Sequence, residues 1–303
     1  MDSANAASAV SPNKQPSSSL TKRIISGVVA LPLIVGATWW GIWAVALVVA
    51  GASIICLAEL YGALKHAGYT PRFTVGIGAA LLLCGASLGY ALDTPTIDLT
   101  SAALGAIVLL SLVYELWHSR HPDDKQLLNW ALTVVAACYV GGLLRYYILL
   151  RSLETPLGPG WLSVLPLSPG TAWVFLVLVI TWGQDTTAYF VGRSFGHHKM
   201  SPILSPKKTW EGAVGGFLAS VLLALAAVPL FGLPIGYPAA ALLGIAGGIA
   251  GPLGDLSESF IKRQIGRKDM SNIMPGHGGL LDRSDSMLFT APVLYYLILL
   301  VAT

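Results

Sequence analysis

Long apolar runs recur along almost the whole chain, and each is about as long as a helix that crosses a bilayer. Such a helix needs about 20 apolar residues. With 54% hydrophobic and 11% charged residues, a soluble protein could not cover its surface with polar groups, since soluble domains carry about 25% charged residues. The sequence therefore predicts an all-α, polytopic membrane protein with nine spans, at 24–41, 43–64, 73–92, 101–117, 128–150, 172–190, 210–230, 238–261 and 286–301.

The first two runs are divided only by Trp39, Trp40 and Gly41. Trp favours the membrane interface and Gly permits a turn, so we expect two spans there. Nearly all of the 18 Lys and Arg residues fall on one side if the spans alternate. Arg151 alone falls on the other side, with Arg145 in or near the end of the fifth span. Because positive loops stay inside, we expect a cytoplasmic N-terminus, an external C-terminus and an active site facing the cytoplasm.

Polarity divides the chain into three parts. Residues 1–22 are polar and predict a disordered cytoplasmic tail. Residues 23–168 carry the N-terminal membrane helices with short loops. Residues 169–303 carry the helices with two long polar segments, and we expect these to form the catalytic part with cytoplasmic loops.

Charge and cysteine content argue against a nucleic-acid partner, a disulfide framework and a zinc site. A net charge of +3 gives no reason to expect a nucleic-acid partner. The three cysteines lie inside apolar runs without a Cys-x-x-Cys pair, so neither a disulfide framework nor a zinc site is expected. They are Cys56, Cys84 and Cys138.

The first polar cluster extends from Asp185 to Glu211. Asp185 lies near the end of an apolar run, where a carboxylate is costly unless it meets a cation or a metal. The segment Ser-Pro-Lys-Lys-Thr at 205–209 is expected to open the next helix, whose free N–H groups suit phosphate. A basic loop that contacts anionic lipid heads is the alternative. The candidate phosphate ligands are Ser205, Lys207, Lys208 and Thr209.

The second polar cluster lies at the end of the eighth run. Asp255, Glu258, Ser259 and Lys262 have i, i+3, i+4 and i+7 spacing, so they share one face of a helix. That face interrupts an apolar span and must look into the protein or a wet cavity. Hard carboxylate oxygens favour Mg²⁺, and cations beside them suit nucleotide phosphate chemistry. Further charges follow at Arg263, Lys268, Asp282, Arg283 and Asp285.

Two other features have structural interpretations. Glu59 and Glu115 lie near span ends, where snorkelling or a helix–helix hydrogen bond is the default expectation. Small residues repeat every fourth position in the seventh and eighth runs, which allows close helix packing. The pairs are Gly212 with Gly216, Gly244 with Gly248, and Gly247 with Gly251.

Together these segments resemble the phosphatidate cytidylyltransferases. The resemblance rests on Asp185 followed by Ala-Tyr-Phe-x-Gly-Arg and Ser-Pro-Lys-Lys-Thr-x-Glu-Gly, and on a second motif from Ser259 to Asp285. That motif is Ser259-x-Ile261-Lys262-Arg263-x4-Lys268-Asp269-x-Ser271-x-x-Met274-Pro275-x-His277-Gly278-Gly279-Leu280-x-Asp282-Arg283-Ser284-Asp285. Met274 and Ser284 depart from the usual packing residues, and His197-His198 stands where many relatives carry Lys.

The resemblance implies a multi-span, Mg²⁺-dependent enzyme of the inner (plasma) membrane. Its reaction would transfer CMP from CTP to phosphatidic acid, giving CDP-diacylglycerol and pyrophosphate, and a homodimer is a further expectation. It implies that Asp255 and Asp282 hold the metal. It assigns no role to Asp185, Glu258 or Asp285, which stay candidate ligands.

We expect a lipid phosphate oxygen to attack the α-phosphorus of CTP directly, with metal and cations neutralising the phosphates. His277 either protonates the leaving pyrophosphate or is a structural residue of a Gly-rich loop. The candidate catalytic residues are Asp255, Lys262, Arg263, His277 and Asp282. The candidate substrate-binding residues are Ser205, Lys207, Lys208, Thr209, Ser259, Lys268 and Arg283.

Two other functions fit parts of the pattern. A CTP-dependent kinase of polyprenol-type lipid alcohols would use similar CTP contacts but would release CDP. A transporter would also carry intramembrane acids. The transporter lacks support because no repeat is evident and the polar residues gather at one face.

Overall fold

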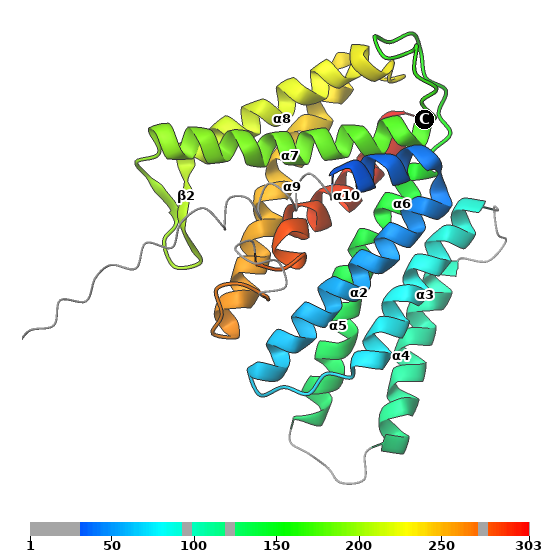
Figure 1. Ribbon diagram of the computed structural model, residues 1–303, viewed down its shortest axis with the longest axis vertical. Coiled ribbons are helices and arrows are strands. Elements are labelled where there is room, and N and C mark those ends of the chain that lie inside the picture. Colours follow the sequence, from blue (N-terminus) through cyan, green and yellow to red (C-terminus); the bar gives the residue numbers. More distant parts are fainter. Residues whose placement is uncertain (1–30, 93–98, 119–124, 272–277, 303) are drawn as a thin grey trace, which may run out of the picture.

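The computed structural model describes residues 31–92, 99–118, 125–271 and 278–302. In this part of the chain, eight segments are helical, long and apolar enough to cross a membrane (Figure 1). The predicted all-α, multi-pass membrane fold is therefore confirmed. The segments are α2 (Ile42–His66), α3 (Phe73–Leu92), α4 (Leu99–His118), α5 (Gln126–Leu144) continued by α6 (Tyr146–Arg151), α7 (Pro169–Phe195), α8 (Trp210–Phe231), α9 (Tyr237–Gln264) and α10 (Leu281–Val301).

The first predicted span is only partly within the described residues. Its described portion forms a short apolar helix, Leu31–Trp40. Gly41 follows with a φ of 144°, and α2 begins at Ile42. The predicted division between the first two runs is thus confirmed. The rest of that span, and the tail predicted at 1–22, lie outside the described residues.

Helix α10 connects two groups of helices. Helices α2 to α5 lie side by side at the lower right of Figure 1, and α7 packs along α8 across its upper part. Helix α10 packs against α9 and α7 and also against α2, α5 and α6. One buried core therefore reaches from Leu57 through Ile148 and Trp173 to Leu243 and Leu288.

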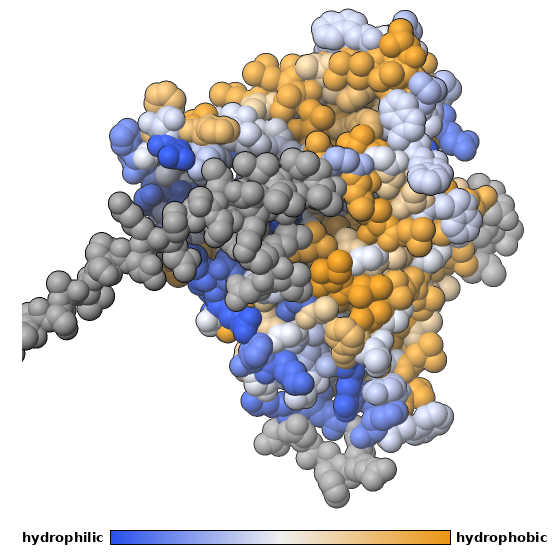
Figure 2. Space-filling view, viewed as in Figure 1, coloured by the Kyte–Doolittle hydropathy of each residue, from blue (hydrophilic) through white to orange (hydrophobic). Residues whose placement is uncertain are grey.

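The outer surface of the molecule is largely apolar. Large side chains such as Leu47, Leu109 and Leu116 are exposed on α2 and α4. Figure 2 shows hydrophobic residues over the upper and right parts of this face, and hydrophilic residues at the left end and along the lower edge. Such a surface is expected where lipid replaces water as the solvent.

Arg145 interrupts the fifth predicted span between α5 and α6. Its guanidinium is buried, donates to Ser87 Oγ at 2.9 Å and lies over the Tyr146 ring. A buried cation needs such partners in an apolar protein.

A short hairpin joins α7 to α8. Strand β1 (Lys199–Ser201) pairs antiparallel with β2 (Ser205–Thr209), with Lys199 opposite Thr209. The prediction that 205–209 opens a helix was wrong, because α8 begins at Trp210 with Thr209 as its N-cap. Thr209 Oγ1 accepts from the Gly212 N–H at 3.2 Å. Pro206 favours extended backbone at Ser205, which suits a strand.

Two glycines of α9, Gly244 and Gly248, allow close packing against α8. A Cβ at Gly244 would lie 2.5 Å from Val221 Cα, and one at Gly248 would lie 3.0 Å from the Phe217 ring. The predicted close packing of these two helices is confirmed for this pair. The other two pairs instead face α7: Gly212 and Gly216 lie at Ala188, and Gly247 and Gly251 lie at Ile180 and Gln184.

We expect Gly244→Leu to destabilise the protein, because the new side chain would meet backbone that cannot turn aside. Overpacking of a filled core costs about 1–3 kcal/mol. Thermal unfolding in detergent measures the effect as a lower Tm. The matched control is Gly105→Leu on α4, where a Cβ meets nothing within 4 Å and Leu is the better helix former. Equal Tm changes in both variants would contradict the packing role.

Candidate active site

The two polar clusters of the sequence meet at one cleft. The cleft has a volume of about 550 Å³ and lies among α7, β2, α8, α9 and α10. Acids and cations from segments far apart in the chain therefore share one space. Its charged lining consists of Asp185, Arg193, Lys207, Lys208, Asp255, Asp282, Arg283 and Asp285.

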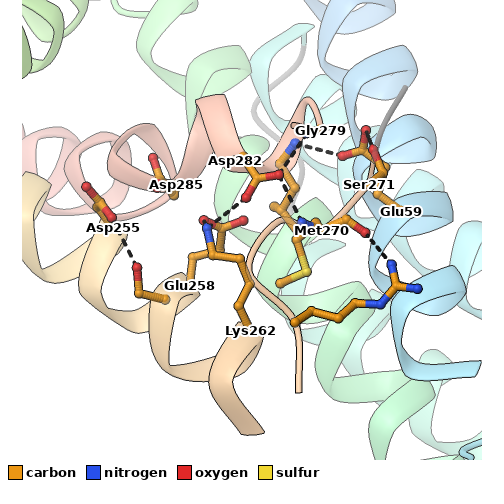
Figure 3. A network of polar contacts seen from close by, with 12 residues as sticks. Glu59, Asp255, Glu258, Lys262, Met270, Ser271, Gly279, Asp282 and Asp285 are labelled. Atoms are coloured by element: carbon orange, nitrogen blue, oxygen red, sulfur yellow. Dashed lines mark hydrogen bonds and ion pairs between the residues drawn. The ribbon is translucent and has the colours of Figure 1, made fainter. Parts of the chain in front are cut away.

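Lys262 joins α9 to α10 beside this cleft (Figure 3). Its Nζ lies 2.6 Å from Glu258 Oε2 and 2.7 Å from Asp282 Oδ1. The Glu258 side chain is 0% exposed and that of Lys262 12% exposed. Glu258 is one turn from Lys262 on α9, which confirms that these polar residues share one helix face. The arrangement holds the ammonium group against Asp282.

Asp282 also binds the backbone around it. Its Oδ2 accepts from the Gly279 N–H at 2.7 Å and from the Met270 N–H at 3.0 Å. Gly278 precedes Gly279 with a φ of 79°, a conformation that favours glycine. Both carboxylate oxygens of Asp282 are thus engaged, so its position in the cleft is fixed from two sides.

Asp255 links α9 to the hairpin. Its Oδ2 lies 2.7 Å from Lys208 Nζ, and its Oδ1 is 3.4 Å from Ser259 Oγ. The Lys208 side chain is largely buried, which leaves its charge beside the acids of the cleft. The hairpin therefore brings a cation to the carboxylates of α9.

Asp185 and Asp285 complete the acidic wall. Ser286 connects them, because its N–H donates to Asp285 Oδ1 at 2.7 Å and its Oγ lies 3.5 Å from Asp185 Oδ1. Asp185 and Asp285 are close enough to Asp255 to repel it electrostatically. Three carboxylates from three helices thus line one cleft.

Only some of the other predicted site residues line the cleft. Lys207, Thr209 and Arg283 line the cleft, with the Thr209 hydroxyl capping α8. Arg263 does not line it and instead donates to the Leu204 carbonyl oxygen at 3.2 Å. His277 lies outside the described residues. Ser205, Glu258, Ser259, Lys262 and Lys268 are also not part of the lining.

Several residues of the site were missed or only partly understood from the sequence. Gln184 lines the cleft and is 1% exposed. Arg193 lines it too and donates to Tyr189 Oη at 3.1 Å. Of the two expectations for Glu59, snorkelling was wrong and a helix–helix hydrogen bond is confirmed, because Glu59 on α2 accepts from the backbone just before and at the start of α10. Only the position of an acid near a span end pointed to Glu59, and no local motif marks Gln184.

Glu115 follows the helix–helix expectation more closely. It accepts from Gln126 Nε2 of α5 at 3.3 Å and from Arg72 Nε at 2.9 Å. The Glu115 carboxylate raises the pKa of Arg72 above its usual range by accepting that hydrogen bond. These contacts are remote from the cleft-lining residues.

The donor set of the cleft fits a hard cation. Among the described residues, no three Asp, Glu, His or Cys side chains converge closely enough to hold a metal by themselves. Mg²⁺, however, is usually held by one or two carboxylates together with substrate phosphates and water. The carboxylates of Asp185, Asp255 and Asp285 at one cleft suit a cation that binds together with a nucleotide.

Fold and cleft together describe a multi-pass membrane protein whose acids and cations meet at one cleft. The family model of the cytidylyltransferase family matches residues 21–301. This chain belongs to that cytidylyltransferase family.

Named relatives agree with the family model. A phosphatidate cytidylyltransferase of Synechocystis sp. is 31% identical over 294 residues, covering 92% of this chain and 97% of the relative. One from Brucella abortus is 34% identical, over 65% of this chain and 82% of the relative. One from Bacillus subtilis is 40% identical, but the match spans 55% of this chain and only 57% of that protein.

Proposed function

We propose that the protein transfers CMP from CTP to phosphatidic acid, forming CDP-diacylglycerol and pyrophosphate. The observation that carries this proposal is the meeting of Asp255, Asp282 and Asp285 with Lys208 at one cleft, beside which Lys262 pairs with Asp282. Membership of the cytidylyltransferase family and the printed names of the relatives support the choice of reaction.

In this reaction, an oxygen of the lipid phosphate attacks the α-phosphorus of CTP. A new P–O bond forms as the bond from the α-phosphorus to the bridging β-phosphate oxygen breaks, and pyrophosphate leaves with that electron pair. The lipid phosphate is already anionic, so no strong base is needed. Lys207, Lys208 and Arg283 bind phosphate oxygens as charge-assisted donors. Lys262 holds Asp282 in place and balances its charge.

A divalent cation such as Mg²⁺ is part of the proposal. When bound, it would neutralise phosphate charge and stabilise the leaving pyrophosphate. Asp255 and Asp282 are its proposed ligands, with Asp285 and Asp185 at the same wall of the cleft. Glu258 is buried behind Lys262, and we assign it to positioning that ammonium group.

We further propose that the protein lies in the inner (plasma) membrane with the cleft facing the cytoplasm. The distribution of Lys and Arg favours that orientation, and CTP is made in the cytoplasm. A homodimer stays a prediction of the family resemblance, which chemical cross-linking in the membrane can test.

The decisive experiment measures pyrophosphate release by purified protein in detergent or nanodiscs. We expect release only when CTP, Mg²⁺ and phosphatidic acid are all present, with CDP-diacylglycerol as the lipid product. Asp255→Asn should lower the rate strongly without preventing folding. CDP release with a lipid alcohol would instead support a kinase, and a folded protein inactive with both lipids would contradict the enzyme proposal.

Removing Lys208 should weaken CTP binding. Lys208→Met takes a cation from the cleft and leaves Asp255 without its partner. We expect the KM for CTP to rise at least about tenfold, the size of one lost charge-assisted hydrogen bond. Steady-state kinetics at saturating phosphatidic acid measures this change.

Lys199→Met is the matched control for Lys208→Met. Lys199 is exposed on β1 of the same hairpin and does not line the cleft. Its KM for CTP should stay within about twofold of the wild-type value, because exposed charges contribute little. Equal effects of both variants would show that only the general charge of the hairpin matters.

A further inference from the structure

Glu59 is a buried acid of the N-terminal helices that reaches the catalytic part. It lies on α2, is 3% exposed and accepts three hydrogen bonds from residues more than 200 positions later. Its Oε1 accepts from Ser271 Oγ at 2.8 Å and from the Leu280 N–H at 2.9 Å, and its Oε2 accepts from the Leu281 N–H at 2.9 Å. Figure 3 shows this carboxylate beside Ser271 and Gly279, on the far side of Asp282 from Asp255.

The N-terminus of α10 has no cap of its own. Leu280 occupies the N-cap position, and its side chain makes no capping hydrogen bond. The first N–H groups of a helix need an acceptor, and the helix dipole favours a negative charge there. Glu59, which lies on α2, supplies both the acceptor and the negative charge. Its carboxylate thus replaces the local Ser, Thr, Asp or Asn that usually caps a helix.

Gly279 leaves room for this contact. A Cβ at that position would overlap the Glu59 carboxylate. The Gly279 N–H turns the other way and donates to Asp282 Oδ2 at 2.7 Å. The backbone N–H groups of 279–281 therefore donate to two carboxylates. Asp282, which lines the cleft, accepts from the first of them, and Glu59, which does not, accepts from the other two.

We propose that Glu59 is a positioning residue, which caps α10 from α2 and thereby fixes Asp282 and Arg283 in the first turn of α10 at the cleft. The N-terminal helices then serve the reaction through one buried carboxylate, in addition to anchoring the protein in lipid. The kinetic consequence of this inference rests on the proposed function, whereas its structural part does not.

Glu59→Gln tests the proposal with little change in shape. An amide offers one acceptor oxygen, and its NH₂ group would face a backbone N–H that needs an acceptor. In folded protein, we expect amide hydrogen exchange in peptides covering 278–285 to rise at least about tenfold, which corresponds to about 1.4 kcal/mol. We also expect kcat to fall at least about tenfold because Asp282 is displaced, while the KM for CTP changes less than about threefold because Lys207 and Lys208 of the hairpin keep their positions.

Two further variants separate positioning from general loosening. Glu115→Gln removes another largely buried acid of the N-terminal helices, one that binds Arg72 away from the cleft. It should leave exchange at 278–285 and kcat unchanged. Ser271→Ala removes one of the three hydrogen bonds to Glu59 and should have a smaller effect. Combined with Glu59→Gln, it should add little, because both act on one contact.

The outcomes divide clearly. Folded Glu59→Gln with wild-type exchange at 278–285 would overturn the capping role. Faster exchange with an unchanged kcat would overturn the positioning role, as would the same loss of kcat in Glu115→Gln. If the wild-type protein released no pyrophosphate, the proposed function would fail, but the exchange measurement would still decide whether Glu59 caps α10.

Discussion

Lys262→Met is expected to remove most of the activity and to lower the Tm. The substitution leaves Glu258, whose side chain is 0% exposed, without its cation. Breaking a buried ion pair by removing one partner costs about 3–5 kcal/mol. It also frees Asp282 from one side, so kcat should fall by about 10²–10³ or more, as when a preorganised electrostatic contact is lost. Pyrophosphate release and thermal unfolding measure the two effects.

A second substitution separates stability from activity. Lys262→Met combined with Glu258→Leu replaces the buried pair by apolar side chains of similar volume, which is often neutral or stabilising. We expect this double variant to regain most of the lost Tm but none of the activity. Lys65→Met, at the exposed end of α2, should change neither. Recovery of activity in the double variant would show that Lys262 serves only to balance Glu258.

The helices and their polar faces were predictable because they follow local rules. Apolar runs of span length indicate the helices, and i, i+4 spacing alone places Glu258 beside Lys262 on one helix face. The segment 205–209 was mistaken for a helix start because its donors suit phosphate in either conformation. Its pairing with β1 depends on a turn that periodicity does not reveal.

The convergence of the cleft could not be predicted from spacing. Asp185, Asp255 and Asp285 lie on three helices, and their proximity depends on how α7, α9 and α10 pack. Family resemblance pointed to both segments but not to the contact between Lys208 and Asp255. Which residues form such contacts depends on the packing of segments that are far apart in the chain.

Glu59 is a second case in which the sequence does not reveal the partner of a charged residue. A single acid near a span end has two common explanations, and neither says which segment the acid meets. Its actual partners, Ser271, Leu280 and Leu281, are more than 200 residues away. The lack of a local cap is visible only in the structure, where α10 begins at Leu281, because Ser284 and Asp285 stand just before the predicted span at 286–301.

Asp282→Asn should be nearly inactive although it has the shape of the wild type. Asp282 accepts from Lys262 Nζ through Oδ1, and from the Met270 and Gly279 N–H groups through Oδ2. Asn has only one acceptor oxygen, so its NH₂ group must face either the ammonium group or two backbone donors. Both choices place donor against donor and leave the cleft one negative charge short.

We expect kcat/KM of Asp282→Asn to fall at least about 10³-fold, because a misdirected charged contact and a proposed metal ligand are lost together. Raising the Mg²⁺ concentration should recover part of the rate if the weakened step is cation binding. Asp269→Asn is the matched control, since Asp269 is exposed in the preceding segment and does not line the cleft. Activity within about threefold of wild type in Asp282→Asn would remove Asp282 from both proposed roles and leave Asp255 and Asp285 as the acids that hold the cation.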